Sequence, residues 1–129
     1  MMTRFLATTL GAIVLSGILM GCGASDDGSI RQSTSSEGAA DHLADAFANA
    51  DSESKKNAGI ASEAIRKGQF QKALYAIETI KKKPDVDFDQ GVAINDSLVN
   101  LERELIYRAE DGDKKAIAAY ELLKRINRN

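Results

Sequence analysis

From residue 40 onward, apolar side chains recur at the spacing of one face of an α-helix. Residues three, four and seven positions apart lie on the same side of a helix, so such a run predicts an amphipathic helix. The runs cover residues 40–47, 58–65, 70–80, 94–105 and 116–123. No stretch alternates between apolar and polar residues with a period of two, the pattern of a half-buried strand. The sequence therefore predicts an all-α fold, a small bundle of four to five helices.

Glycine, proline and aspartate separate these runs where helices are expected to end and begin. Gly68 and Gly112 each follow a run, and glycine readily adopts the positive φ that closes many helices. Pro84 cannot continue the helix before it. Asp87 and Gln90 have the spacing of a capping box, so a long helix should begin directly after Asp87.

The apolar positions within the runs predict the core of the bundle. Leucine and isoleucine at helical spacing face the neighbouring helices, while charged residues occupy the opposite face. The side chains expected to be buried are Leu74, Ile77, Leu98, Leu101, Leu105, Tyr120 and Leu123.

Two of the expected helices have similar sequences. Residues 71–82 align with residues 114–125, and lysine, alanine and glutamate recur at matching positions. The first of these segments also resembles the second helix of a tetratricopeptide repeat, through Gly68, Phe70, Ala73, Leu74, Ile77, Ile80 and the following Pro84. The resemblance implies two stacked helical hairpins over residues 55–126. A bundle without an evolutionary repeat is an equal alternative, since alanine and lysine are common in any helix.

The N-terminal segment has a different character. Residues 5–20 are uncharged, too few for a membrane span of about 20 residues but suited to a secretory signal. The run ends at Leu19, Met20, Gly21 and Cys22, and Cys22 is the only cysteine in the chain. This end resembles the lipobox of bacterial lipoproteins. The resemblance implies cleavage between Gly21 and Cys22, a diacylglycerol on the Cys22 sulfur and an acyl chain, typically palmitate, on its amine.

The lipobox resemblance also sets the expected domain organisation. Residues 1–21 would be a signal peptide, residues 22–38 a flexible tether rich in glycine, serine and aspartate, and residues 39–129 the helical domain. By the same resemblance, Gly23 after the lipidated cysteine favours the outer over the inner membrane, with the domain facing the periplasm. Residues 25–27 also resemble surface-export signals, which leaves surface display as an alternative.

Acidic residues between two expected helices suggest an alternative function, a calcium-binding helical adhesion or assembly module that uses the loop from Asp85 to Asp96. Asp85, Asp87, Asp89 and Asp96 occupy positions 1, 3, 5 and 12 of an EF-hand-type loop, whose ligands are oxygens. Position 6 of such a loop is a turn glycine, but here it is Gln90. The alternative, favoured by the capping box, is that Asp87 starts a helix and no calcium loop forms.

No pattern in the sequence indicates an enzyme or a cofactor. His42 is the only histidine and lies between Asp41 and Asp45, so we expect it on the surface. The net charge of −2 gives no general attraction to nucleic acid.

The sequence predicts a lipid-anchored protein that binds or scaffolds an envelope partner. Tyr75 and Tyr107 fall off the main stripes of their helices and are the candidate partner-binding residues, while the oligomeric state stays open.

Overall fold

The computed structural model describes residues 30–129, and within them the predicted all-α fold is confirmed. The predicted signal peptide, Cys22 and the first part of the predicted tether lie outside the described residues. Five helices and no strand occur in residues 30–129. Their bounds are α1 Ser36–Ala46, α2 Ser52–Arg66, α3 Phe70–Lys81, α4 Phe88–Glu110 and α5 Lys114–Ile126.

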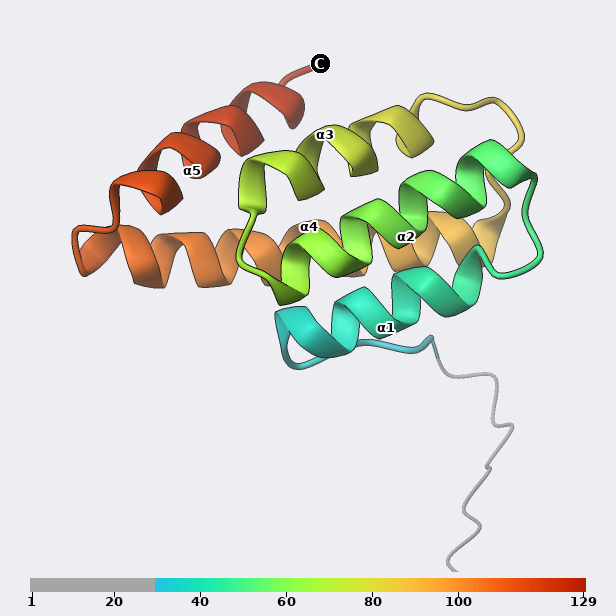
Figure 1. Ribbon diagram of the computed structural model, residues 1–129, viewed down its shortest axis with the longest axis horizontal. Coiled ribbons are helices and arrows are strands. Elements are labelled where there is room, and N and C mark those ends of the chain that lie inside the picture. Colours follow the sequence, from blue (N-terminus) through green and yellow to red (C-terminus); the bar gives the residue numbers. More distant parts are fainter. Residues whose placement is uncertain (1–29) are drawn as a thin grey trace, which may run out of the picture.

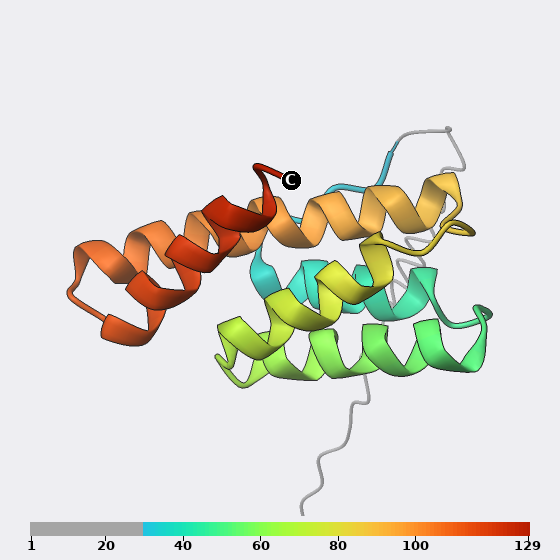
Figure 2. The same cartoon turned by 90° about the horizontal axis from the view of Figure 1, so that it is seen from above.

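Each helix runs antiparallel to the one before it in the chain (Figure 1). Helix α1 packs between α2 and α4, and α3 packs against α2, α4 and α5. The C-terminal half of α4 extends beyond α1 and α2, and α5 folds back along it (Figure 2). The outer side of α4 therefore forms one long edge of the molecule.

Aspartates start three of the helices. Asp51 accepts hydrogen bonds from the backbone N–H groups of Glu53 and Ser54 at the start of α2. Asp113 accepts equivalent bonds from Lys115 and Ala116 at the start of α5. At α4 the predicted capping box is confirmed. The Gln90 N–H donates to Asp87 over 2.8 Å, and the Asp87 N–H donates to the Gln90 side chain over 3.1 Å. These bonds satisfy N–H groups that a helix leaves unpaired at its first turn.

Gly68 and Gly112 close α2 and α4 as predicted, with φ values of +69° and +84°. In this region a side chain with a Cβ atom costs about 1–2 kcal/mol. At these two positions the positive φ of the backbone therefore favours glycine over any residue with a Cβ atom.

A pair of glycine substitutions tests this assignment. Gly68→Ala should lower the free energy of unfolding by about 1–2 kcal/mol, because its φ is positive. Gly59→Ala, in the middle of α2, should instead raise it by about 0.5–1 kcal/mol, because alanine is the better helix former. An added Cβ at Gly59 would meet no atom within 4 Å. Urea unfolding measures both, and equal effects of the two substitutions would contradict the assignment.

The predicted core is confirmed at six of its seven residues. Leu74, Ile77, Leu101, Leu105 and Leu123 are fully buried, and Leu98 is nearly so. The prediction was wrong for Tyr120, which is only half-buried. Its ring lies at the edge of the core, and the Lys124 ammonium sits 5.1 Å from the ring centre on the outer side.

The folded structure begins earlier than the predicted boundary at residue 39. Ser35 caps α1 by accepting a hydrogen bond from the Gly38 N–H over 3.1 Å. Residues 30–34 are not helical, yet the Ser33 backbone is bonded to α4. The last part of the predicted tether is therefore attached to the domain.

The two similar segments coincide with α3 and α5 to within one residue at each end, and these two helices contact each other. Helices α2 and α3 form one antiparallel hairpin, and α4 and α5 form a second (Figure 1). Helix α1 belongs to neither hairpin and packs against one helix of each. A five-helix bundle describes residues 30–129, and a common origin of the hairpins stays a prediction.

Candidate functional site

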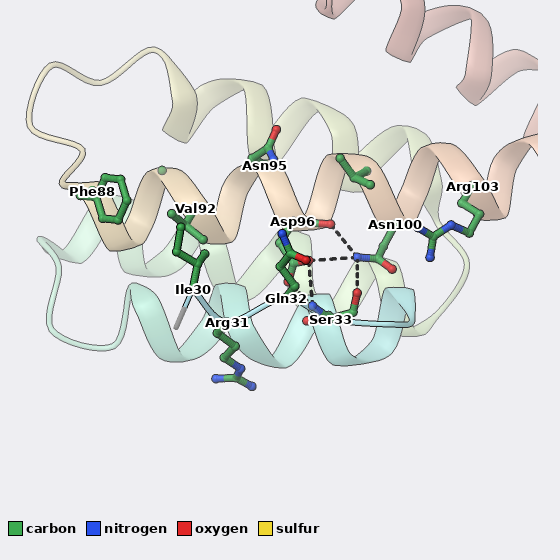
Figure 3. Close-up of a pocket in the computed structure, with 12 residues that line it drawn as sticks. Ile30, Arg31, Gln32, Ser33, Phe88, Val92, Asn95, Asp96, Asn100 and Arg103 are labelled. Carbon is green, nitrogen blue, oxygen red and sulfur yellow. Dashed lines mark hydrogen bonds between the residues drawn. The ribbon is translucent and has the colours of Figure 1, made fainter. Parts of the chain in front are cut away.

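A groove of about 510 Å³ lies between residues 30–33 and the outer face of α4 (Figure 3). Ile30 lies beside Val92 there, and Phe88 stands at the N-terminal end of the helix. Phe88 is 72% exposed and Val99 is 45% exposed, so the groove presents apolar surface to solvent. The residues that line it are Ile30, Arg31, Gln32, Ser33, Phe88, Gly91, Val92, Asn95, Asp96, Val99, Asn100 and Arg103.

The floor of the groove is tied together by the carboxylate of Asp96, which is buried. Its oxygens accept the Ser33 backbone N–H over 3.0 and 3.2 Å and lie 2.9 Å from Nδ1 of His42. The side-chain amide of Asn100, one turn further along α4, donates to it over 3.1 Å. One carboxylate thus joins the N-terminal segment, α1 and α4.

Asn100 fastens the same segment at further points. Its amide nitrogen donates to the Ser33 carbonyl over 3.2 Å and to the Asp96 carbonyl over 2.9 Å. The Ser36 hydroxyl donates to the Asn100 carbonyl over 3.3 Å. Both backbone polar groups of Ser33 are therefore satisfied by α4, and the segment is held along one side of the groove.

Two opposing effects act on the pKa of Asp96. Burial raises the pKa by disfavouring the charged form, but the hydrogen bonds from Ser33 and His42 outweigh burial and hold it below the usual range of an aspartate. Asp96 is therefore ionised near neutral pH. Since an ionised carboxylate can only accept hydrogen bonds, Nδ1 of His42 carries the proton between them.

The prediction that His42 lies on the surface was wrong, because the residue is 7% exposed. Its carboxylate partner is 54 positions away in the chain, so neighbouring residues gave no sign of the contact. No local signal in the sequence marked the pair, because the burial of Asp96, Ser97 and Asn100 follows from packing of α4 against α1 and the segment before it.

The structure does not form the EF-hand-type loop. Asp87 caps α4, and the positions from Phe88 to Asp96 are helical. Asp96 is directed to Ser33 and His42, one heptad further along the helix than Asp89. In residues 30–129, no three carboxylate, histidine or cysteine side chains are grouped closely enough to hold a metal ion. Helix α4 therefore separates the carboxylates that the loop would bring together.

The predicted partner-binding tyrosines are both exposed, but they belong to different helices. Tyr75 lies on α3 beside a shallow hollow that it shares with Glu78, Lys83 and Pro84. Tyr107 lies near the end of α4 and is 69% exposed. Neither tyrosine lines the groove beside Asp96.

The groove is suited to an apolar group bordered by charge. Arg31 and Arg103 lie on its rim, and an adjoining hollow of about 460 Å³ adds Asp45, Asp89 and the edge of His42. Because His42 is engaged by Asp96, the pair serves here to hold the groove's walls together.

Comparison with protein-family models, with curated proteins and with solved structures finds no match. Among the helices of residues 30–129, none is both long enough and apolar enough to span a bilayer.

Proposed function

We propose that this protein is a bacterial lipoprotein whose helical domain binds or scaffolds another component of the cell envelope. The observation that carries the proposal is the sequence Leu19, Met20, Gly21 and Cys22 at the end of an uncharged run. Two or three acyl chains on Cys22 would give stable anchoring, since one chain alone binds a bilayer only weakly.

The way the chain enters the domain supports this proposal. Ile30 is eight residues after Cys22, so an extended chain reaches at most about 28 Å from the anchor to the groove. Ser33 is bonded to α4, so the described part of the N-terminal segment begins beside the groove. The groove would then lie near the membrane surface, and Gly23 after the cysteine favours the outer membrane.

Binding, rather than catalysis, is the proposed activity. The groove and the exposed tyrosines Tyr75 and Tyr107 offer apolar and aromatic surface, which dominates binding energy at interfaces. The hairpin pairs α2–α3 and α4–α5 would provide the scaffold, as in tetratricopeptide-like proteins.

Cys22→Ser should abolish incorporation of a labelled fatty acid and leave the precursor uncleaved, because serine offers no thiol for the thioether. The measurement is labelling in a bacterial host, followed by the apparent mass of the protein. Ser25→Ala is the matched control and should be labelled like the wild type. A wild-type protein that incorporates no label would show that Cys22 is not a lipidation site.

Replacing Tyr75 and Tyr107 with alanine should reduce capture of an envelope partner and leave the melting temperature nearly unchanged, because both rings are exposed. The measurement is affinity capture from native membranes alongside thermal unfolding. Lys55→Ala and Lys56→Ala, also exposed, are the controls. A large fall in melting temperature would show that the tyrosines act in folding and not in binding.

A further inference from the structure

Helix α4 carries a second apolar stripe, on the side away from the core. Its inner face supplies core leucines, but three outward apolar residues remain exposed, namely Phe88, Val99 and Ile106 at 72%, 45% and 39%. Together with Val92, Asn95 and Glu102, they form a series whose members are alternately four and three positions apart. We call this set the outer stripe; it consists of Phe88, Val92, Asn95, Val99, Glu102 and Ile106.

Alternation of three and four is the pattern of a two-stranded coiled coil. Such positions stay on one seam of a helix and pack into holes on a second helix. The stripe runs through almost the whole of α4, whose 23 residues span about 34 Å. Two of its six positions, Asn95 and Glu102, are polar.

We propose that the outer stripe pairs with the outer stripe of a second copy of this chain, with the two α4 helices antiparallel. The stripe is symmetric about residue 97, so antiparallel pairing places Phe88 against Ile106 of the second copy. It likewise places Asn95 against Val99. Parallel pairing would instead put Glu102 against Glu102, which like charges disfavour.

Charges beside the stripe match the antiparallel arrangement. Asp89 and Arg103 each follow a stripe residue by one position and are exposed on the same flank. Antiparallel pairing brings Asp89 of each copy near Arg103 of the other, so two opposite-charge pairs form by symmetry. Within residues 30–129, neither side chain takes part in an ion pair.

The surface around the stripe leaves room for a second helix. Hollows lie on both flanks, the groove of about 510 Å³ beside residues 30–33 and another of about 380 Å³ beside Val86 and Leu98. Gly91 lines both hollows, and nothing lies within 4 Å of where its Cβ would be. Symmetry places Arg103 of the second copy over this gap.

A lipid surface is the other apolar partner to consider, and the charges disfavour it. Phe88, the most exposed apolar side chain of the stripe, is flanked by Asp87 and Asp89, with Asp85 nearby. These carboxylates would be repelled by anionic headgroups. In the dimer, Asp89 of each copy instead lies near the positively charged Arg103 of the other copy.

The first test is sedimentation equilibrium of the full-length protein in density-matched detergent. Wild type should form a concentration-dependent dimer, and Val99→Asp or Phe88→Asp should weaken it at least about tenfold, as expected for a charge placed in an apolar seam. Phe88 is the first residue of α4, where an acidic side chain suits the helix dipole, so Phe88→Asp should stay folded. Lys72→Ala, exposed on α3 and away from the stripe, is the control and should dimerise normally.

The second test is a charge exchange that reports the register. Asp89→Arg and Arg103→Asp should each weaken the dimer, because each places like charges together. The double variant should recover dimerisation, since it restores two opposite pairs. Circular dichroism on each variant shows that the fold is retained.

Three results would overturn the proposal. One is a wild-type protein that stays monomeric at every concentration. Another is a dimer that survives Val99→Asp and Phe88→Asp, which would place the interface elsewhere. The third is a protein that stays monomeric and whose binding to phosphatidylglycerol vesicles is lost in Phe88→Asp. None of these results bears on lipid labelling of Cys22, so the dimer and the anchor fail independently.

Discussion

Asp96→Ala should lower the free energy of unfolding by about 2–5 kcal/mol, because each buried group left without its hydrogen-bond partner costs about 1–3 kcal/mol. The substitution leaves His42 without its hydrogen-bond partner and the Ser33 N–H without an acceptor. It also frees residues 30–33 from the side of the groove. Urea unfolding at pH 7 measures the loss, and increased proteolysis near residue 33 would report the release of the segment.

Two controls separate this network from a general effect of removing charge. Asp89→Ala removes an exposed carboxylate from the same helix and should cost less than about 1 kcal/mol, mainly through the helix dipole. Asp96→Asn keeps the shape of the side chain, so its loss in free energy of unfolding should lie between those of Asp96→Ala and Asp89→Ala. A loss below about 1 kcal/mol for Asp96→Ala would contradict the role assigned to the network.

The Asp96 contribution should also depend on pH in a defined direction. Because the pKa of Asp96 is lowered in the folded state, its contribution is present above the unfolded value of about 4 and is lost as the pH falls through the folded pKa. The difference in stability between wild type and Asp96→Asn should therefore shrink below pH 4. The pKa of Asp51 is lowered too, through hydrogen bonds from Ser54, so the comparison with Asp96→Asn is needed to isolate Asp96.

Leu101→Ala should cost about 2–5 kcal/mol, because it leaves a cavity at a fully buried position of α4. Domains of this size have total free energies of unfolding of about 5–15 kcal/mol. A loss of this size is therefore a large fraction of the total. Chemical unfolding measures the change.

Val99→Ala is the matched control for Leu101→Ala. It removes methyl groups from the same helix on the exposed face, so the monomer should lose less than about 1 kcal/mol. Comparable losses for the two substitutions would mean that α4 is rotated relative to the core described here.

The helices and their ends were predictable because they depend on residues close together in the chain. The Asp87–Gln90 capping box joins positions three apart, and Gly68 adopts a positive φ within a single turn. Leu101 and Leu105 repeat at the helical period, which marks the buried face without knowledge of the neighbouring helices.

The candidate site was only partly predictable, because its contacts join distant segments. The apolar residues of α4 were visible in the sequence, but the segment that completes the groove was expected to be a free tether. Ser33 meets Asp96 across 63 positions, and His42 meets it across 54. Local composition favours flexibility for residues 30–33, and the hydrogen bonds to α4 override it.

The sequence by itself determined the helical class, the helix ends and most of the core, since each depends on local spacing. Only the tertiary structure decided that His42 is buried, that Tyr120 lies at the edge of the core and that Asp96 holds the N-terminal segment. Those outcomes depend on which helices pack together. A hydrogen bond between residues more than fifty positions apart leaves no periodic trace in either segment.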